Sequence, residues 1–246
     1  MSDRIAVLIV DDSRLFRSAV EEALRGQPDI AVVGSVFSGA KALEFIRQSP
    51  PHVVTLDVEM PGLDGLATLE QIEQFNAGRS PAEKIGVIMV SAFTRRGADV
   101  TVRALEAGAF DFVTKPAGPS PEANLATLRE ALLPRIRACA RGRVATSLPT
   151  GAAVRPVVTP IPTGPRRQAA IAAVVIGSST GGPKALATVL PELCSRIRLP
   201  ILIVQHMPPN FTQSLAESLT RQSQHSVVEG SDGITLASAR DRKSVV

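Results

Sequence analysis

Aromatic residues are scarce in this sequence, which has eight phenylalanines and neither tryptophan nor tyrosine. Its cores must therefore be built from Val, Leu, Ile and Ala, a composition that suits buried parallel strands. The scarcity also argues against binding of single-stranded nucleic acid, because such sites stack bases on aromatic side chains. The formal net charge of +4 does not restore that case, because many of the arginines lie between residues 129 and 167 with no aromatic residue among them. We expect no nucleic-acid partner.

Cysteine and long apolar runs are also lacking. The two thiols, Cys139 and Cys194, have no CxxC spacing and no neighbouring histidine, so we expect small buried side chains without a disulfide. No apolar run reaches eighteen residues, about the minimum for a transmembrane helix. The first ten residues lack the apolar stretch behind a basic start that marks a signal peptide. These absences predict a cytoplasmic protein with no membrane insertion.

Apolar runs alternate with amphipathic segments through residues 1–137. Strands are expected at 5–10, 30–34, 52–56, 86–90 and 110–114. Helices are expected at 15–26, 39–48, 66–75, 97–108 and from residue 121 onward, the last with an apolar face of Leu125, Leu128, Leu132 and Ile136. This alternation predicts an α/β fold, a flavodoxin-like doubly wound sheet of five parallel strands.

A second pattern follows a segment of different composition. Residues 138–169 are rich in Pro, Gly and Arg without an amphipathic period, which predicts an extended linker. From residue 170 a strand ending at Ile176, the turn GSSTGG, a helix at 183–190 and a strand at 200–204 are expected. Residues 170–246 are therefore interpreted as the first part of a second parallel-sheet, Rossmann-like domain.

Polar residues follow the predicted strands of the first domain where each strand ends. Asp11 and Asp12 follow the first strand, Asp57 the third, Ser91 the fourth and Lys115 the fifth. Carboxyl ends of parallel strands share one edge, where open α/β sheets bind ligands. Three converging carboxylates need a cation, and Mg²⁺ prefers such oxygen ligands. A single Asp after a strand can also cap a helix, but five such residues together predict a site that holds a phosphoryl group on a carboxylate.

The first domain resembles the response-regulator receiver family from residue 4 to about 137. The motifs that carry the resemblance are VDDS (10–13), LDVEMPGLDG (56–65), VSAFT (90–94) and DFVTKP (111–116). The resemblance implies that Asp57 accepts phosphate from a histidine kinase. The Mg²⁺ ligands that it implies are Asp11, Asp12, Asp57 and the backbone carbonyl of Glu59. The switch residues that it implies are Ser91, Phe112 and Lys115.

The second domain contains a candidate nucleophile. Gly177–Gly181 satisfies G-x-S-x-G between a predicted strand and a predicted helix, the context of a nucleophile elbow centred on Ser179. A glycine-rich turn before a helix can instead bind phosphate through its amides. His206 follows the next predicted strand and would lie on the same edge as Ser179. A serine–histidine pair needs an orienting acid, yet Glu229, Asp232 and Asp241 follow no predicted strand.

Three further motifs resemble the chemotaxis-specific protein-glutamate methylesterase family: IGSSTGGPKA (176–185), QHMPPNFT (205–212) and EGSDGITL (229–236). The resemblance implies hydrolysis of glutamate methyl esters, and deamidation of glutamines, on chemoreceptors. It implies Ser179 as nucleophile, His206 as base and Thr180 as an active-site neighbour. The family's catalytic Asp lies further downstream, so the third triad member is absent from this chain, which resembles a C-terminally truncated member.

The final residues depart from the family pattern. A common sequencing-library adapter encodes DRKSVV, so we interpret 241–246 as an artefact of a gene fragment. A non-enzymatic binding or regulatory protein with an inactive second module remains the alternative function. A DNA-binding output would require a helix-turn-helix, and strand–GSSTGG–helix–strand is not one. Because both sites are expected at strand carboxyl ends, we expect the unphosphorylated receiver to cover the Ser179–His206 cleft.

Overall fold

The computed structural model describes residues 4–92, 94–144, 171–234 and 243–245. Its first sheet is parallel, with the strand order β2-β1-β3-β4-β5. The strands are β1 (Ile5–Val10), β2 (Ile30–Val36), β3 (Val53–Asp57), β4 (Gly86–Ser91) and β5 (Asp111–Thr114). This order is that of the flavodoxin-like doubly wound fold, so the predicted fold class is confirmed.

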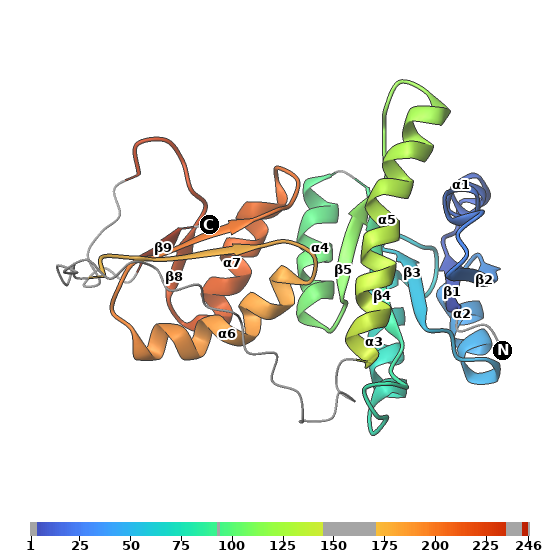
Figure 1. The fold of residues 1–246 in the computed structure, drawn as a ribbon, viewed down its shortest axis with the longest axis horizontal. Coiled ribbons are helices and arrows are strands. Elements are labelled where there is room, and N and C mark those ends of the chain that lie inside the picture. Colours follow the sequence, from blue (N-terminus) through green and yellow to red (C-terminus); the bar gives the residue numbers. More distant parts are fainter. Residues whose placement is uncertain (1–3, 93, 145–170, 235–242, 246) are drawn as a thin grey trace, which may run out of the picture.

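Helices cover both faces of this sheet (Figure 1). One face packs against α1 (Arg14–Leu24) and α5 (Pro121–Val144). The other packs against α2 (Gly39–Gln48), α3 (Gly65–Asn76) and α4 (Arg95–Glu106). The first four helices each begin after a residue whose side chain accepts a hydrogen bond from a first-turn amide, namely Ser13, Ser38, Asp64 and Thr94. These caps place each helix start beside the strand end that precedes it.

The helix α5 is longer than the sequence predicts. It continues through Pro134 to Val144, so the first seven residues of the expected linker, 138–144, are helical. Leu128, Leu132, Ile136 and Cys139 are buried along one side of this helix, and this packing extends it past the predicted boundary at residue 137. The rest of the predicted linker, up to residue 169, lies outside the described residues.

The second sheet is also parallel, with the order β6-β7-β9-β8. Its strands are β6 (Val174–Ser178), β7 (Ile201–Gln205), β8 (Ser226–Val228) and β9 (Lys243–Val245), and its helices are α6 (Gly182–Arg196) and α7 (Phe211–Ser223). The sequence did not predict α7, β8 or β9. The two strands have only three residues each, and the buried side of α7 includes Ser214, Ser218 and Ser223, which interrupt its apolar period.

Both helices of the second sheet pack on the same face of it. Leu186 and Leu190 of α6 and Leu215 and Leu219 of α7 are buried in a core with Ile201 and Ile203 of β7. The alternate positions Val175 and Val204 are 69% and 66% exposed, so none of the described helices covers the opposite face of β6 and β7. No helix in the described part of the chain is long and apolar enough to cross a membrane.

Candidate functional site

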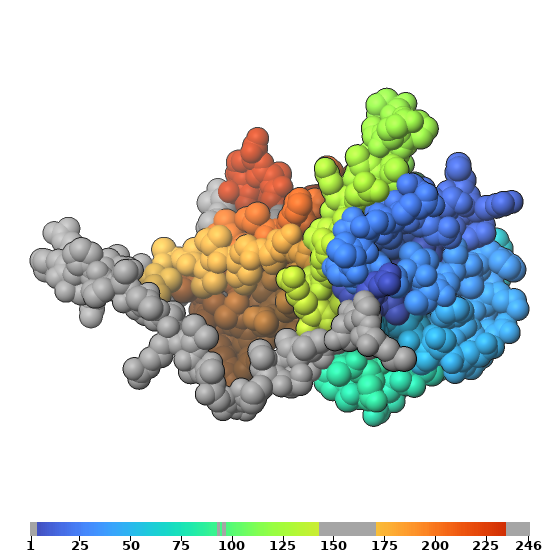
Figure 2. Space-filling model, turned by 45° about the vertical axis from the view of Figure 1, so that its right-hand side comes forward, coloured from blue at the N-terminus to red at the C-terminus, as the bar shows by residue number. Residues whose placement is uncertain are grey.

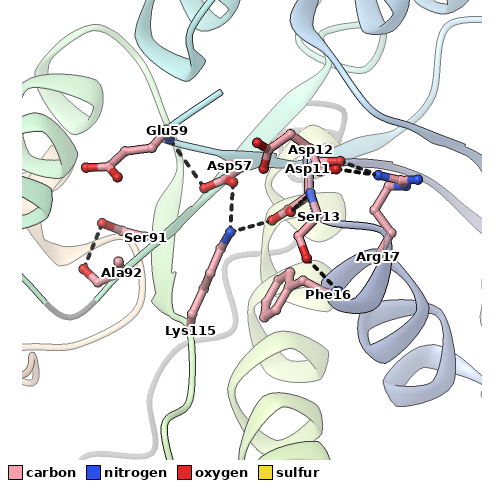
Figure 3. Close-up of polar contacts among 10 residues, drawn as sticks. All are labelled: Asp11, Asp12, Ser13, Phe16, Arg17, Asp57, Glu59, Ser91, Ala92 and Lys115. Carbon is pink, nitrogen blue, oxygen red and sulfur yellow. Dashed lines mark hydrogen bonds and ion pairs between the residues drawn. The ribbon is translucent and has the colours of Figure 1, made fainter. Parts of the chain in front are cut away.

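The predicted acidic cluster forms at the carboxyl edge of the first sheet (Figure 3). Oxygen atoms of Asp11, Asp12 and Asp57 lie within 4.8 Å of one another. The Nζ atom of Lys115 lies 2.7 Å from Asp11 Oδ2 and 2.7 Å from Asp57 Oδ2. Asp11 and Asp57 are buried, whereas Asp12 faces solvent. The cluster is thus an enclosed acidic pair with one lysine bridge and one side accessible to solvent.

Backbone amides hold the two buried carboxylates in place. The amide of Ser13 donates to Asp11 Oδ1 at 2.8 Å, and the amide of Glu59 donates to Asp57 Oδ1 at 3.3 Å. Behind Asp57, a Cβ atom at Gly65 would lie 2.1 Å from the Asp57 carbonyl oxygen. The start of α3 can therefore approach β3 this closely only with glycine at position 65.

The charges in the cluster alter one another's protonation. Burial raises the pKa of Asp57 to about 6, the Asp11 carboxylate acts in the same direction, and the Lys115 ammonium opposes both. Burial alone would lower the pKa of Lys115, but its bonds to Asp11 and Asp57 outweigh that effect and raise it. Lys115 therefore stays protonated and offsets one of the negative charges.

Two of the predicted switch residues lie on neighbouring strands. Ser91 ends β4, is fully buried, and its hydroxyl donates to the Ala92 carbonyl at 3.3 Å. Phe112 lies in β5 and is 5% exposed. Its ring stacks on Phe211, the first residue of α7, with ring centroids 4.7 Å apart and an interplanar angle of 13°. The predicted switch aromatic is therefore in contact with the second module.

The candidate serine and histidine lie together at the edge of the second sheet. β6 and β7 pair in parallel, and the amide of His206 donates to the Ser178 carbonyl at 3.0 Å. Ser179 Oγ lies 3.4 Å from His206 Nδ1. Gly181 has φ 72°, a left-handed conformation that allows the sharp turn from Ser179 into α6. The predicted pair is therefore assembled, with Thr180 exposed beside it.

No carboxylate among the described residues hydrogen-bonds to His206. The expectation that Glu229 follows no strand is wrong, because β8 ends at Val228. Glu229 instead accepts a hydrogen bond from Thr212 in α7. Asp232 lies in a turn, and Asp241 lies outside the described residues. An orienting acid for His206 is thus missing from the described part of the chain.

The two modules meet along α4 and the segment leading into β5 (Figure 1). Figure 2 shows the receiver, in blue to lime green, directly beside the second module, in orange to red. From the receiver, Asp99 accepts a hydrogen bond from Ser214 at 2.6 Å, and Glu106 accepts from Ser218, Arg221 and Gln222. Asp99, Glu106, Ser214 and Arg221 line a polar cleft of about 310 Å³ between α4 and α7. Nearby, Lys184 Nζ donates to the Gly108 carbonyl at 3.0 Å.

This contact differs from the expectation that the receiver covers the Ser179–His206 cleft. The side chains of Ser179 and His206 are exposed, and the receiver packs on the helices that follow them. The sequence could not single out Asp99 or Glu106, because an acidic residue on an exposed helix face is ordinarily solvated. Phe211 gave one signal, an aromatic residue just after the QHMPP motif in a chain with few aromatics.

Comparison with known proteins assigns both modules. Residues 7–125 match the response regulator receiver domain, and residues 174–240 match the CheB methylesterase domain. A protein-glutamate methylesterase/protein-glutamine glutaminase from Nocardioides sp. is 42% identical over 233 residues, 92% of this chain and 60% of that protein. A protein of the same name from Symbiobacterium thermophilum is 43% identical over 246 residues, 95% of this chain and 66% of that protein.

Among solved structures, the response regulator domain of Thermotoga maritima CheB is 38% identical to this chain. The matched region is 56% of this chain and 97% of that domain, with a TM-score of 0.48. The present chain spans 60 to 66% of the length of the two curated relatives. The strand β9 lies beyond the residues that match the methylesterase domain.

Proposed function

This chain belongs to the CheB family of response regulators, and we propose that phosphorylation of Asp57 controls a serine hydrolase module built on Ser179 and His206. The substrates are glutamate methyl esters, and glutamine amides, on chemoreceptors. The observation that carries the proposal is the paired assembly of two sites in one chain, an acidic pocket with Lys115 and a serine 3.4 Å from a histidine nitrogen.

In the receiver, an Asp57 oxygen attacks the phosphorus of a phosphohistidine on a histidine kinase. The P–N bond breaks, the histidine leaves, and an acyl phosphate forms on Asp57. Lys115 already lies 2.7 Å from Asp57 Oδ2, so its ammonium can stay close to the incoming phosphoryl oxygens. Ser91 ends the neighbouring strand, and its hydroxyl is proposed to donate to one of those oxygens.

The donor set of the receiver pocket fits Mg²⁺. Three carboxylates face one ammonium group, which leaves two negative charges uncompensated among oxygen ligands. We propose Asp11, Asp12, Asp57 and the carbonyl of Glu59 as the groups that hold the ion. When bound, Mg²⁺ supplies positive charge to the phosphoryl oxygens.

In the second module, Ser179 Oγ attacks the ester carbonyl carbon while His206 Nδ1 takes the hydroxyl proton. The tetrahedral intermediate collapses, methanol leaves with that proton, and an acyl-serine remains. Water then attacks the acyl-serine, and the free carboxylate is released. The distance of 3.4 Å is looser than a catalytic hydrogen bond, as is common before substrate binds.

The interface between the modules offers a route of control. Phe112 of the receiver stacks on Phe211, which opens α7 a few residues after His206. A change in the position of the Phe112 ring on phosphorylation would therefore act on α7 and on residues 206–210, the histidine loop that joins β7 to α7. We propose that the receiver acts on the geometry of the histidine loop through α7, because the two catalytic side chains are already exposed.

Selective labelling of Ser179 by a fluorophosphonate tests the proposal. We expect modification of Ser179 and not of its neighbour Ser178, loss of the label in His206→Ala, and a higher rate after phosphorylation of the chain. Equal labelling of wild type and His206→Ala would contradict a serine–histidine hydrolase.

A second candidate function has one observation in its favour. Because no described carboxylate orients His206, the second module of this chain could act as a phosphorylation-dependent binding partner without turnover. Absence of Ser179 labelling, together with phosphorylation-dependent changes at the α4–α7 interface, would favour this alternative.

A further inference from the structure

The side chain of Gln205 connects the serine turn to the strand that carries the histidine. Its Oε1 atom accepts a hydrogen bond from Ser178 Oγ at 2.6 Å. Its Nε2 group donates to the Ser179 carbonyl at 2.9 Å and to the His206 carbonyl at 3.3 Å. One carboxamide therefore bonds to the residue before the candidate nucleophile, to the nucleophile and to the candidate base.

The Ser179 carbonyl receives a second hydrogen bond. The amide of Gly182 donates to it at 2.8 Å, so two donors occupy the acceptor positions of this oxygen. Rotation of the peptide plane that follows Ser179 would break both bonds. The direction in which Ser179 leaves the turn is therefore fixed from α6 on one side and from Gln205 on the other.

The residue at position 182 is fitted to the same carboxamide. A Cβ atom there would lie 2.0 Å from Gln205 Oε1 and 2.9 Å from Ser178 Oγ. Any side chain at position 182 would displace the side-chain carboxamide of Gln205. Gly182, the last glycine of the GSSTGG turn, therefore provides the space in which the Gln205 carboxamide lies.

We propose that Gln205 is a positioning residue that sets the distance and direction between Ser179 Oγ and His206 Nδ1. The proposal rests on the hydrolase function proposed for this pair. Gln205 does not touch the reacting atoms; it restrains the backbone on both sides of them. Proton transfer depends steeply on such geometry, and a displacement of about 1 Å can cost about 100-fold in rate.

The test compares three variants of the 246-residue chain. Gln205→Leu removes all three hydrogen bonds at similar volume. Gln205→Glu keeps an acceptor for Ser178 and loses the donor to Ser179 and His206. Val204→Thr is the matched control, because it lies on the same strand with its side chain 66% exposed.

Fluorophosphonate labelling of Ser179 gives the first readout. Gln205→Leu and Gln205→Glu are expected to lower the maximal inactivation rate about 10-fold or more, with an unchanged probe affinity and an unchanged Tm. Val204→Thr is expected to label like wild type. Wild-type rates in Gln205→Glu would overturn the proposal, because the donor bonds would then be dispensable. A variant that fails to fold is replaced by Ser178→Ala, which removes only the bond of 2.6 Å.

The ¹⁵N NMR signal of His206 Nδ1 gives a readout that needs no reaction. Ser179→Ala is expected to shift this signal in the wild-type background and to leave it unchanged in the Gln205→Leu background. An equal shift in both backgrounds would overturn the positioning role. If the wild-type chain shows the shift but Ser179 is never labelled, the hydrolase function fails while the role of Gln205 in pairing the side chains stands.

Discussion

At the scale of single residues, Asp57 carries two opposing properties. It must be ionised to act as a nucleophile, yet burial raises its pKa to about 6. Lys115, at 2.7 Å, is the contact that keeps the carboxylate available near neutral pH. Asp57 is therefore expected to accept a phosphoryl group and, when ionised, to lower the stability of the folded receiver.

Asp57→Asn is expected to abolish phosphorylation by a small-molecule phosphodonor in the presence of Mg²⁺. An amide is not a nucleophile, and it also weakens the set of carboxylates that would hold the ion. Mass spectrometry of the intact protein measures the uptake. Glu70→Gln, an exposed position on α3, serves as the control, and a phosphorylated Asp57→Asn chain would show that the acceptor lies elsewhere.

Asp57→Asn is also expected to raise the Tm of the receiver at pH 7 without Mg²⁺. The folded pKa of about 6 exceeds the ordinary value of 3.8, so between these values the folded state binds more protons than the unfolded state. The contribution of Asp57 to the free energy of unfolding therefore falls as the pH rises through that window. The gain in Tm should be smaller at pH 4, where Asp57 is largely protonated. A gain that is equal at both pH values would contradict the raised pKa.

The residues that the sequence could identify were those at strand ends. Asp11, Asp57 and Lys115 meet because parallel strands present their carboxyl ends at one edge, and this follows from the strand order alone. Gln205 could not be identified, because its role depends on hydrogen bonds and on the space above Gly182, neither of which a linear pattern reports.

At the scale of elements, α4 and α7 form the contact that joins the modules. Glu106 accepts hydrogen bonds from three side chains of α7. Its pKa is lowered, because these bonds and the charge of Arg221 outweigh the burial that would raise it. The ionised carboxylate is therefore the form that favours docking of α7 on α4.

Glu106→Gln is expected to loosen the docking of α7 on α4. The amide loses the charge that strengthens these bonds, a cost of about 1 kcal/mol for a partly exposed group, or about fivefold in the undocked population. Hydrogen–deuterium exchange of α7 amides measures the change, with Glu70→Gln again as the control. Unchanged exchange in α7 would show that Glu106 does not hold the modules together.

Elements were predictable where the apolar period was strong and at least four residues long, as in β5. All strands of the first sheet met this condition. In the second sheet β8 and β9 are too short, and α7 buries serines because hydroxyls on its receiver side bond to Asp99 and Glu106. A helix whose buried face is polar at an interface between modules has no apolar stripe to detect.

At the scale of the whole molecule, the two sheets differ in how completely they are covered. The first sheet has helices on both faces, as parallel sheets normally do. The second has α6 and α7 on one face, with Val175 and Val204 exposed on the other. The receiver is therefore expected to fold as an ordinary stable domain, while the second module carries an exposed apolar surface.

The 246-residue chain is expected to accept phosphate on Asp57 but to show no measurable demethylation of a methylated chemoreceptor. No described carboxylate orients His206, and loss of a triad member typically costs about 10⁴-fold in turnover. Its uncovered sheet face should also make the second module the first part cleaved in limited proteolysis. Release of intact receiver fragments, with Asp57 still phosphorylatable, is the expected result. Robust demethylation would show that another group orients His206, and equal protease resistance of both modules would show that the exposed face of β6 and β7 is protected.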